Sequence, residues 1–145
     1  LQVNFGTLWI QRDDWHQATE CFRHALFLND HSPTAWVGLA LCHQVRGDLE
    51  LAFANVERAL DEDPCNETAI SLIMDWARDQ KQFGRATTRF TDFIDAGCFS
   101  PALSQSFIRK AVHFGENALA DWESFHLNVR AERNCFNVLA ERNRG

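Results

Sequence analysis

The residues of this sequence that could do chemistry are a few cysteines and histidines. Cys21 and His24 lie one helical turn apart, which is the spacing that a Cys–His nucleophile or half of a metal site requires. The interpretation we favour instead places Cys21 in the core and His24 at the solvent edge. Cys42 and His43 are adjacent, so their side chains diverge on a helix. We therefore expect His43 to be a core histidine and not a ligand.

Motifs of common enzyme classes are missing from the sequence. It contains no Gly-rich phosphate loop, no G-x-S-x-G, no H-E-x-x-H and no C-x-x-C. The seven glycines stand singly, mostly where turns are expected. We therefore predict no catalytic residue, no cofactor and no metal within residues 1–145. We predict no enzymatic activity in this part of the chain.

Cysteine usage and hydropathy bear on the compartment. The cysteines are odd in number and scattered over apolar helical faces, which predicts reduced, buried thiols and a cytoplasmic location. No run approaches the roughly 18 apolar residues of a membrane span, so we expect no membrane insertion. The chain starts at Leu1 and not at Met, which fits an excised piece of a longer protein. The five cysteines are Cys21, Cys42, Cys65, Cys98 and Cys135.

Charge and size limit the class of partner. The formal net charge of −6 argues against a nucleic-acid partner, because phosphate binding requires clustered Lys and Arg. A chain of 145 residues is long enough to bury a core of its own. The composition therefore favours a globular domain and disfavours a nucleic-acid partner.

The elements that position these residues repeat along the chain. Small and apolar residues recur every 34 residues, in segments that have the hydrophobic periodicity of paired helices. Three sets keep this step: Ala18, Ala52, Ala86 and Ala120; Phe22, Val56, Phe90 and Ser124; Ala25, Ala59, Phe93 and Leu127.

The clearest repeat, Thr34–Pro64, resembles the tetratricopeptide repeat (TPR) family. Val56 stands where the family usually has Phe, and His43 stands where it usually has an aromatic residue. The resemblance extends over most of the chain as about four repeats, and it implies an all-α, right-handed solenoid of antiparallel helix pairs. The family's W-x2-L-G/A…A…A…P positions hold Trp36, Leu39, Ala40, Ala52, Ala59 and Pro64.

We expect one TPR-like domain over residues 1–145, with repeats at about 1–31, 32–65, 66–99 and 100–128. Capping residues mark the expected helix starts, namely Asp13 and Asp14, Ser32 before Pro33, Asn66, and Ser100 before Pro101. The third repeat is predicted as one helix to about Gln80 and a second over 83–96.

The fourth repeat departs from the family pattern. Its first helix is predicted to run to about His113, followed by a turn at Gly115. Ser124 replaces the expected bulky residue in the second helix, and a C-terminal helix is expected over 129–145. This end either caps the core or docks against a neighbouring domain, and self-association through it is a further expectation.

The resemblance implies a binding site on the concave face, which the first helix of each repeat lines. The chaperone-binding subclass of the family grips a carboxylate with Lys and Asn, but here those positions hold Val3, Thr7, Gly38, Thr68 and Leu72. We therefore expect a different ligand. The predicted groove residues are Val3, Thr7, Ile10, Thr34, Val37, Leu41, Gln44, Ser71, Asp75, Arg78, Asp79, Gln105, Arg109, Val112 and His113.

The predicted groove is apolar at its amino end and charged at its carboxyl end. This pattern favours a scaffold that binds a protein segment, helical or extended, with an apolar anchor and a charged tail. The alternative is a non-catalytic helical arm that positions the substrate of a larger enzyme, such as a transferase.

Overall fold

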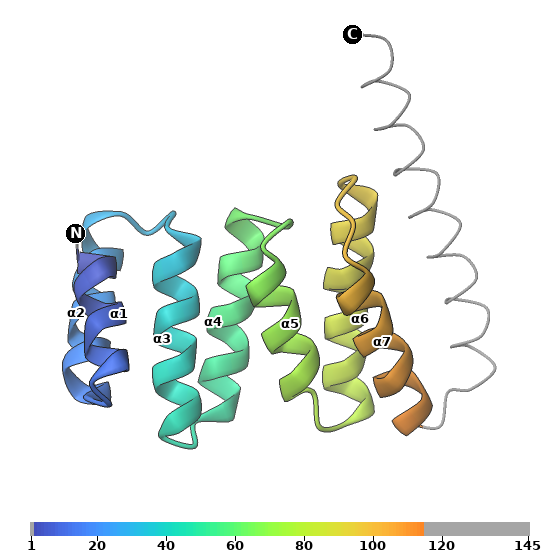
Figure 1. Ribbon diagram of the computed structural model, residues 1–145, viewed down its shortest axis with the longest axis horizontal. Coiled ribbons are helices and arrows are strands. Elements are labelled where there is room, and N and C mark those ends of the chain that lie inside the picture. Colours follow the sequence, from blue (N-terminus) through green and yellow to red (C-terminus); the bar gives the residue numbers. More distant parts are fainter. Residues whose placement is uncertain (1, 115–145) are drawn as a thin grey trace, which may run out of the picture. The chain divides into compact units, whose positions relative to one another are not determined.

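The computed structural model describes residues 2–114, and this part of the chain is α-helical with no strand (Figure 1). The all-α helical-repeat prediction is confirmed over this range. The predicted C-terminal helix and the second helix of the fourth repeat lie outside the described residues. The helices are α1 (Gln2–Gln11), α2 (Trp15–Leu28), α3 (Pro33–Val45), α4 (Leu49–Glu62), α5 (Glu67–Trp76), α6 (Gln80–Asp95) and α7 (Pro101–His113).

The chain divides into two compact units, Leu1–Trp76 and Ala77–Gly145. Unit 1 contains α1 to α5, and the described part of unit 2 contains α6 and α7. The division falls inside the expected third repeat, between its two helices.

Unit 1 is a row of helices in which neighbours in sequence pack on one another, and α1 also packs against α3. Its alanines lie at the helix contacts, where Ala18 and Ala52 are fully buried, as the 34-residue period predicts. One cluster of buried residues at the amino end joins α2 to α3, and side chains of α1 pack against it. The cluster consists of Ala18, Phe22, Ala25, Ala35, Leu39 and Cys42.

The ring of Phe22 occupies the space that two glycines leave open. A Cβ added at Gly6 of α1 would lie 2.7 Å from the ring, and a Cβ added at Gly38 of α3 would lie 2.4 Å from it. Any side chain at either position would therefore overlap with Phe22. The backbones of α1 and α3 therefore both approach the Phe22 ring closely, at Gly6 and at Gly38.

The predicted helix starts are confirmed at four positions. The side chain of Asp14 accepts a hydrogen bond from Gln17 N (3.1 Å), and the hydroxyl of Ser32 accepts one from Ala35 N (3.3 Å). Asn66 and Ser100 cap α5 and α7 in the same way. The turn glycines Gly47 and Gly97 have φ of 87° and 88°, a conformation that residues with a Cβ adopt rarely.

The predicted boundary between α5 and α6 is wrong. The first helix of the third repeat ends at Trp76 and not near Gln80, and α6 already begins at Gln80. The reason is a reciprocal cap: Asp79 accepts a hydrogen bond from Gln82 N (2.7 Å), while the Gln82 side chain accepts one from Arg78 N (2.9 Å). These bonds fix the start of α6, although the sequence on both sides of this point has a helical pattern.

The described part of unit 2 has an aromatic core. Phe107 of α7 lies between two rings of α6, with centroids 5.6 Å from Phe83 and 5.5 Å from Phe90. Phe114, at the end of α7, packs on Phe83 at 5.3 Å. Such offset ring pairs add stability beyond their buried area. They hold α6 and α7 together as a helix pair.

Candidate functional site

The Cys–His pairs occupy structural positions. His24 is exposed, as predicted, whereas Cys21 is a free thiol that is half-buried and does not belong to the buried core. Cys42 is fully buried, and burial raises the pKa of its thiol. A thiol held neutral in this way is a poor nucleophile.

His43 is buried, with only 8% of its surface exposed. Its Nδ1 has no hydrogen-bond partner and lies 4.0 Å from Oδ2 of Asp48. Burial lowers the pKa of His43, and the nearby carboxylate of Asp48 opposes this effect only in part. His43 is therefore a core side chain, and its burial favours the neutral form. No group of three or more His, Cys, Asp or Glu that could hold a metal occurs within residues 2–114.

The prediction of reduced thiols is wrong at two positions. Cys21 and Cys42 are free, but Cys65 and Cys98 are each disulfide-bonded. Both lie in turns that follow the second helix of a repeat, Cys65 after α4 and Cys98 after α6. Disulfides persist mainly in oxidising compartments, so the argument from reduced thiols to a cytoplasmic location fails. Cys135 lies outside the described residues. None of the helices within residues 2–114 is long and apolar enough to cross a membrane.

Unit 1 carries the larger part of the predicted groove, on α1, α3 and α5. Thr7, Thr34 and Asp75 are exposed there, and Ser71 and Gln44 are half-buried. The hydroxyl of Thr7 donates to the carbonyl of Val3 (3.0 Å), which leaves its lone pairs able to accept. The apolar predicted residues are half-buried or buried: Val3, Ile10, Leu41 and Val37.

Val37 is more buried than a groove residue should be, with 8% of its surface exposed. The cause is the inner position of α3, which packs against α1, α2 and α4. Leu41, one turn further along the helix, keeps part of its surface accessible. Of the two apolar residues predicted for the groove on α3, Leu41 is therefore the more accessible.

Unit 2 carries the charged part of the prediction. Gln105, Arg109, Val112 and His113 are exposed on α7, and Arg109 lies 3.4 Å from the hydroxyl of Ser106. Arg78 and Asp79 lie in the turn before α6 and not on a first helix. Because the Asp79 carboxylate caps α6, it already has a structural role.

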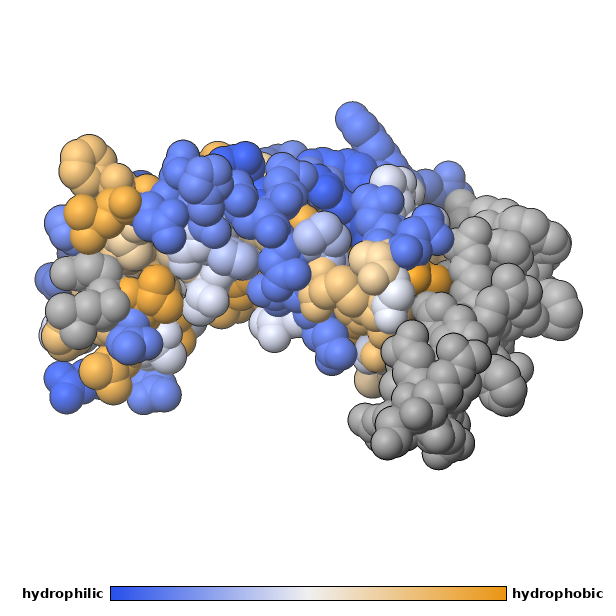
Figure 2. Space-filling view, turned by 90° about the horizontal axis from the view of Figure 1, so that it is seen from above, coloured by the Kyte–Doolittle hydropathy of each residue, from blue (hydrophilic) through white to orange (hydrophobic). Residues whose placement is uncertain are grey.

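Sequence reasoning missed a group of exposed apolar side chains on α1 and α2. Phe5 and Leu8 of α1 are 44% and 47% exposed, and Phe27 of α2 is 87% exposed. Figure 2 shows apolar residues gathered over the α1–α2 end of unit 1. One signal was present in the sequence: Phe27 occupies the repeat position that Asp61 holds one repeat later.

Comparison with known proteins supports the fold. No protein-family model matches the chain, and no curated protein sequence matches it. Among solved structures, PilF of Pseudomonas aeruginosa is similar, with a TM-score of 0.63 and 20% sequence identity. The alignment covers 88% of this chain and 60% of the PilF chain, so the chain spans about 60% of that structure's length. With its helices and 34-residue period, the chain has a TPR-like helical-repeat fold similar to that of PilF.

Proposed function

We propose that this protein is a non-catalytic interaction scaffold that binds a segment of another protein on the first helices of unit 1. We call this surface the first-helix face, and define it by Val3, Thr7 and Ile10 of α1, Leu41 and Gln44 of α3, and Ser71 and Asp75 of α5. The observation that carries the proposal is that α1 and α3 combine half-buried apolar side chains with polar side chains that are exposed or half-buried. Interfaces that bind peptides have this composition, an apolar centre with polar groups around it.

The chemistry of the face defines the ligand. Leu41 and Ile10 offer partly exposed apolar surface to one anchoring side chain. Thr7 and Gln44 can hydrogen-bond to a peptide backbone beside it. Residues 1–76 contain twelve Asp and Glu against four Arg, a formal charge of −8. We therefore expect a segment with one large apolar residue and a nearby Lys or Arg.

A peptide-display selection on the purified protein tests this proposal. Selected peptides are synthesised, and their affinity is measured for the wild type, for Leu41→Arg and for Leu51→Arg. Leu51 is a matched control, because it is a helical leucine of α4 that is 52% exposed and lies outside the first-helix face.

Losing the contact of one apolar side chain costs about 1.5–3 kcal/mol, which corresponds to roughly 10- to 100-fold in affinity. We expect this loss for Leu41→Arg and less than about a twofold change for Leu51→Arg, with both variants retaining the wild-type circular dichroism spectrum. Equal binding by all three folded proteins would place the ligand elsewhere and end the proposal.

A further inference from the structure

The side of α3 that faces α2 shows how one repeat receives the helix before it. Gly38 lies against the ring of Phe22, and Leu39 belongs to the same buried cluster. Cys42 belongs to this cluster as well, together with Ala18 and Phe22 of α2. Gly38, Leu39 and Cys42 thus form one stripe along α3, which α2 covers.

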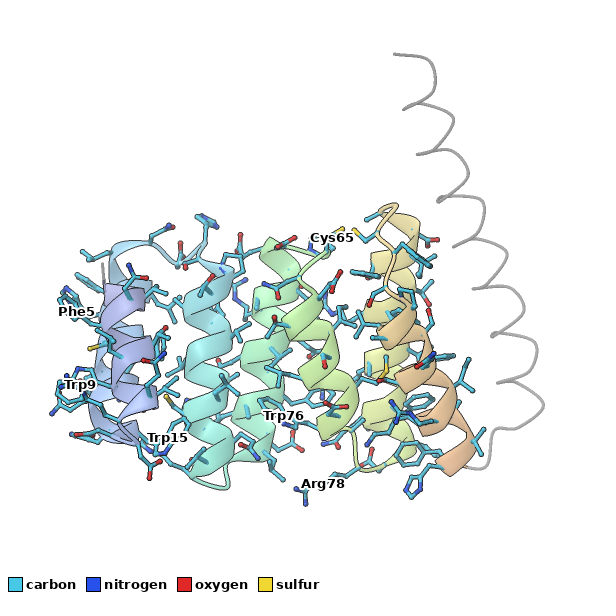
Figure 3. The ribbon with its side chains drawn as sticks, viewed as in Figure 1. Phe5, Trp9, Trp15, Cys65, Trp76 and Arg78 are labelled. Carbon is cyan, nitrogen blue, oxygen red and sulfur yellow. The ribbon has the colours of Figure 1, made fainter. Side chains whose placement is uncertain are left out.

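The same stripe on α1 is uncovered. Asn4, Phe5 and Leu8 stand 34 residues before Gly38, Leu39 and Cys42. All three are exposed, Phe5 by 44% and Leu8 by 47%. Figure 3 shows Phe5 projecting outward from α1.

A third helix supports the comparison. Ile73 of α5 stands one repeat after Leu39, and it is fully buried where α4 packs on α5. The position is therefore covered in both first helices of unit 1 that have a second helix packed before them. On α1 it exposes an aromatic ring to solvent, an arrangement that favours association.

The interface between α2 and α3 specifies the shape of an occupant. A helix on α1 would lie as α2 lies on α3, with one residue in the place of Phe22. That residue must be smaller than Phe, because Asn4 has a side chain where Gly38 has none, and Gly38 leaves no space beside the ring. Val56 of α4 follows this rule, since α5 carries Leu72 in the place of Gly38.

The charge of the surrounding surface specifies a second property of the occupant, the sign of its own charge. The helix α1 has no acidic or basic residue in its first or last turn, and its sequence QVNFGTLWIQ contains none elsewhere. The surrounding unit has a formal charge of −8 over residues 1–76. A cationic helix is attracted by this field, whereas a second copy of the chain, with a net charge of −6, is repelled.

We propose that Asn4, Phe5 and Leu8, the α1 stripe, bind a cationic amphipathic helix of a partner protein in the way that α3 binds α2. The site is separate from the first-helix face and does not depend on the function proposed for that face. The partner adds a further helix to the row and buries the exposed ring of Phe5.

A peptide derived from α2 provides the probe. It has the sequence of residues 14–29 with four changes. Phe22→Val fits Asn4, and Cys21→Ser prevents oxidation. Gln17→Lys and Glu20→Lys add positive charge at two positions that are exposed in α2. The labelled peptide is titrated with the protein, and the affinity is measured by fluorescence anisotropy.

Three variants locate the binding. We expect Leu8→Glu to weaken binding at least tenfold, because it places a charge in the apolar contact. Leu51→Glu, at a leucine of similar exposure, should change the affinity less than about twofold. Leu41→Arg should also leave it unchanged, since Leu41 belongs to the first-helix face.

Other outcomes overturn the proposal. Equal binding by wild type and Leu8→Glu, or no binding to wild type at about 1 mM protein, excludes the α1 stripe as a helix site. Loss of binding in Leu41→Arg alone would assign the peptide to the first-helix face. A dimer in sedimentation that dissociates in Leu8→Glu, together with no peptide binding, would make the occupant a second copy.

Discussion

Replacing Gly38 by Ala tests whether the ring of Phe22 is held between α1 and α3. The new Cβ would lie 2.4 Å from two ring carbons, whereas carbon atoms in contact prefer about 3.5–4.0 Å. The ring must therefore move by about 1 Å or more. Movement toward α1 is blocked, because Gly6 already approaches the ring closely from that helix.

Two contributions of opposite sign set the change in unfolding free energy. Alanine is better than glycine in a helix interior by about 0.5–1 kcal/mol. Overpacking a core costs about 1–3 kcal/mol, and a ring blocked on both sides favours the upper part of that range. We expect Gly38→Ala to destabilise unit 1 by about 1–2 kcal/mol. Gly84→Ala is the control: no atom lies within 4 Å of its Cβ, so the helix contribution alone should stabilise α6 by about 0.5–1 kcal/mol.

Hydrogen exchange with mass spectrometry in increasing denaturant reads the two helices separately, because α3 and α6 yield different peptides. In Gly38→Ala, the α3 peptides should lose their protection from exchange at a lower denaturant concentration than in wild type. In Gly84→Ala, the α6 peptides should lose their protection at a higher concentration than in wild type. In a Phe22→Val background, Gly38→Ala should become neutral or stabilising, since the ring is gone. If Gly38→Ala stabilises α3 as much as Gly84→Ala stabilises α6, the Phe22 ring does not lie where we place it.

Three further predictions use other parts of the described chain. Ala52→Arg should abolish the folded state of unit 1, because a fully buried alanine cannot admit a guanidinium group, and a melting temperature within about 2 °C of wild type would contradict this. Burial lowers the pKa of His43 below its ordinary value of 6.5, so on acidification the unfolded chain binds a proton at His43 before the folded chain does. The free energy of unfolding should therefore fall as the pH drops below about 6.5. In denaturant titrations, His43→Phe should make this dependence of the unfolding free energy on pH less steep. His31 changes the stability in the opposite direction, because hydrogen bonding to Glu62 raises its pKa and its stabilising contribution is lost as the pH rises. His31 must therefore be present in both proteins that are compared. In denaturant without reductant, iodoacetamide should label Cys21 and Cys42 but label Cys65 and Cys98 only after reduction, and labelling of all four without reduction would exclude the disulfides.

The sequence was sufficient for features that depend on nearby residues. Asp14 and Ser32 cap helices whose first amides lie three residues away, so the bonds can be read from spacing alone. The alanine positions were predictable because a period of 34 residues brings them to the same helix contact in each repeat. The predicted start of α6 was wrong, although it too depends only on nearby residues, because the Asp79–Gln82 cap lies within a continuous helical pattern.

Features that depend on neighbouring helices could not be predicted in this way. Val37 and Leu41 have similar apolar character and the same expected face, yet the packing around α3 buries Val37 more deeply. Phe5 keeps the 34-residue step of Leu39 and Ile73, which are buried, yet it is exposed. Its exposure follows from the absence of a covering helix on that side within the described residues, which a repeat pattern does not encode.

The most direct test of the account is an NMR titration of the isotope-labelled protein with a peptide selected for binding. We expect the amide signals of α1 and α3 to shift together, with Thr7, Leu41 and Gln44 among the largest changes and saturation at one peptide per chain. The signals of α2 and α4 should change little, because these helices carry no residue of the first-helix face. Shifts confined to α2 and α4, with α1 and α3 unaffected, would contradict the assignment of binding to the first helices.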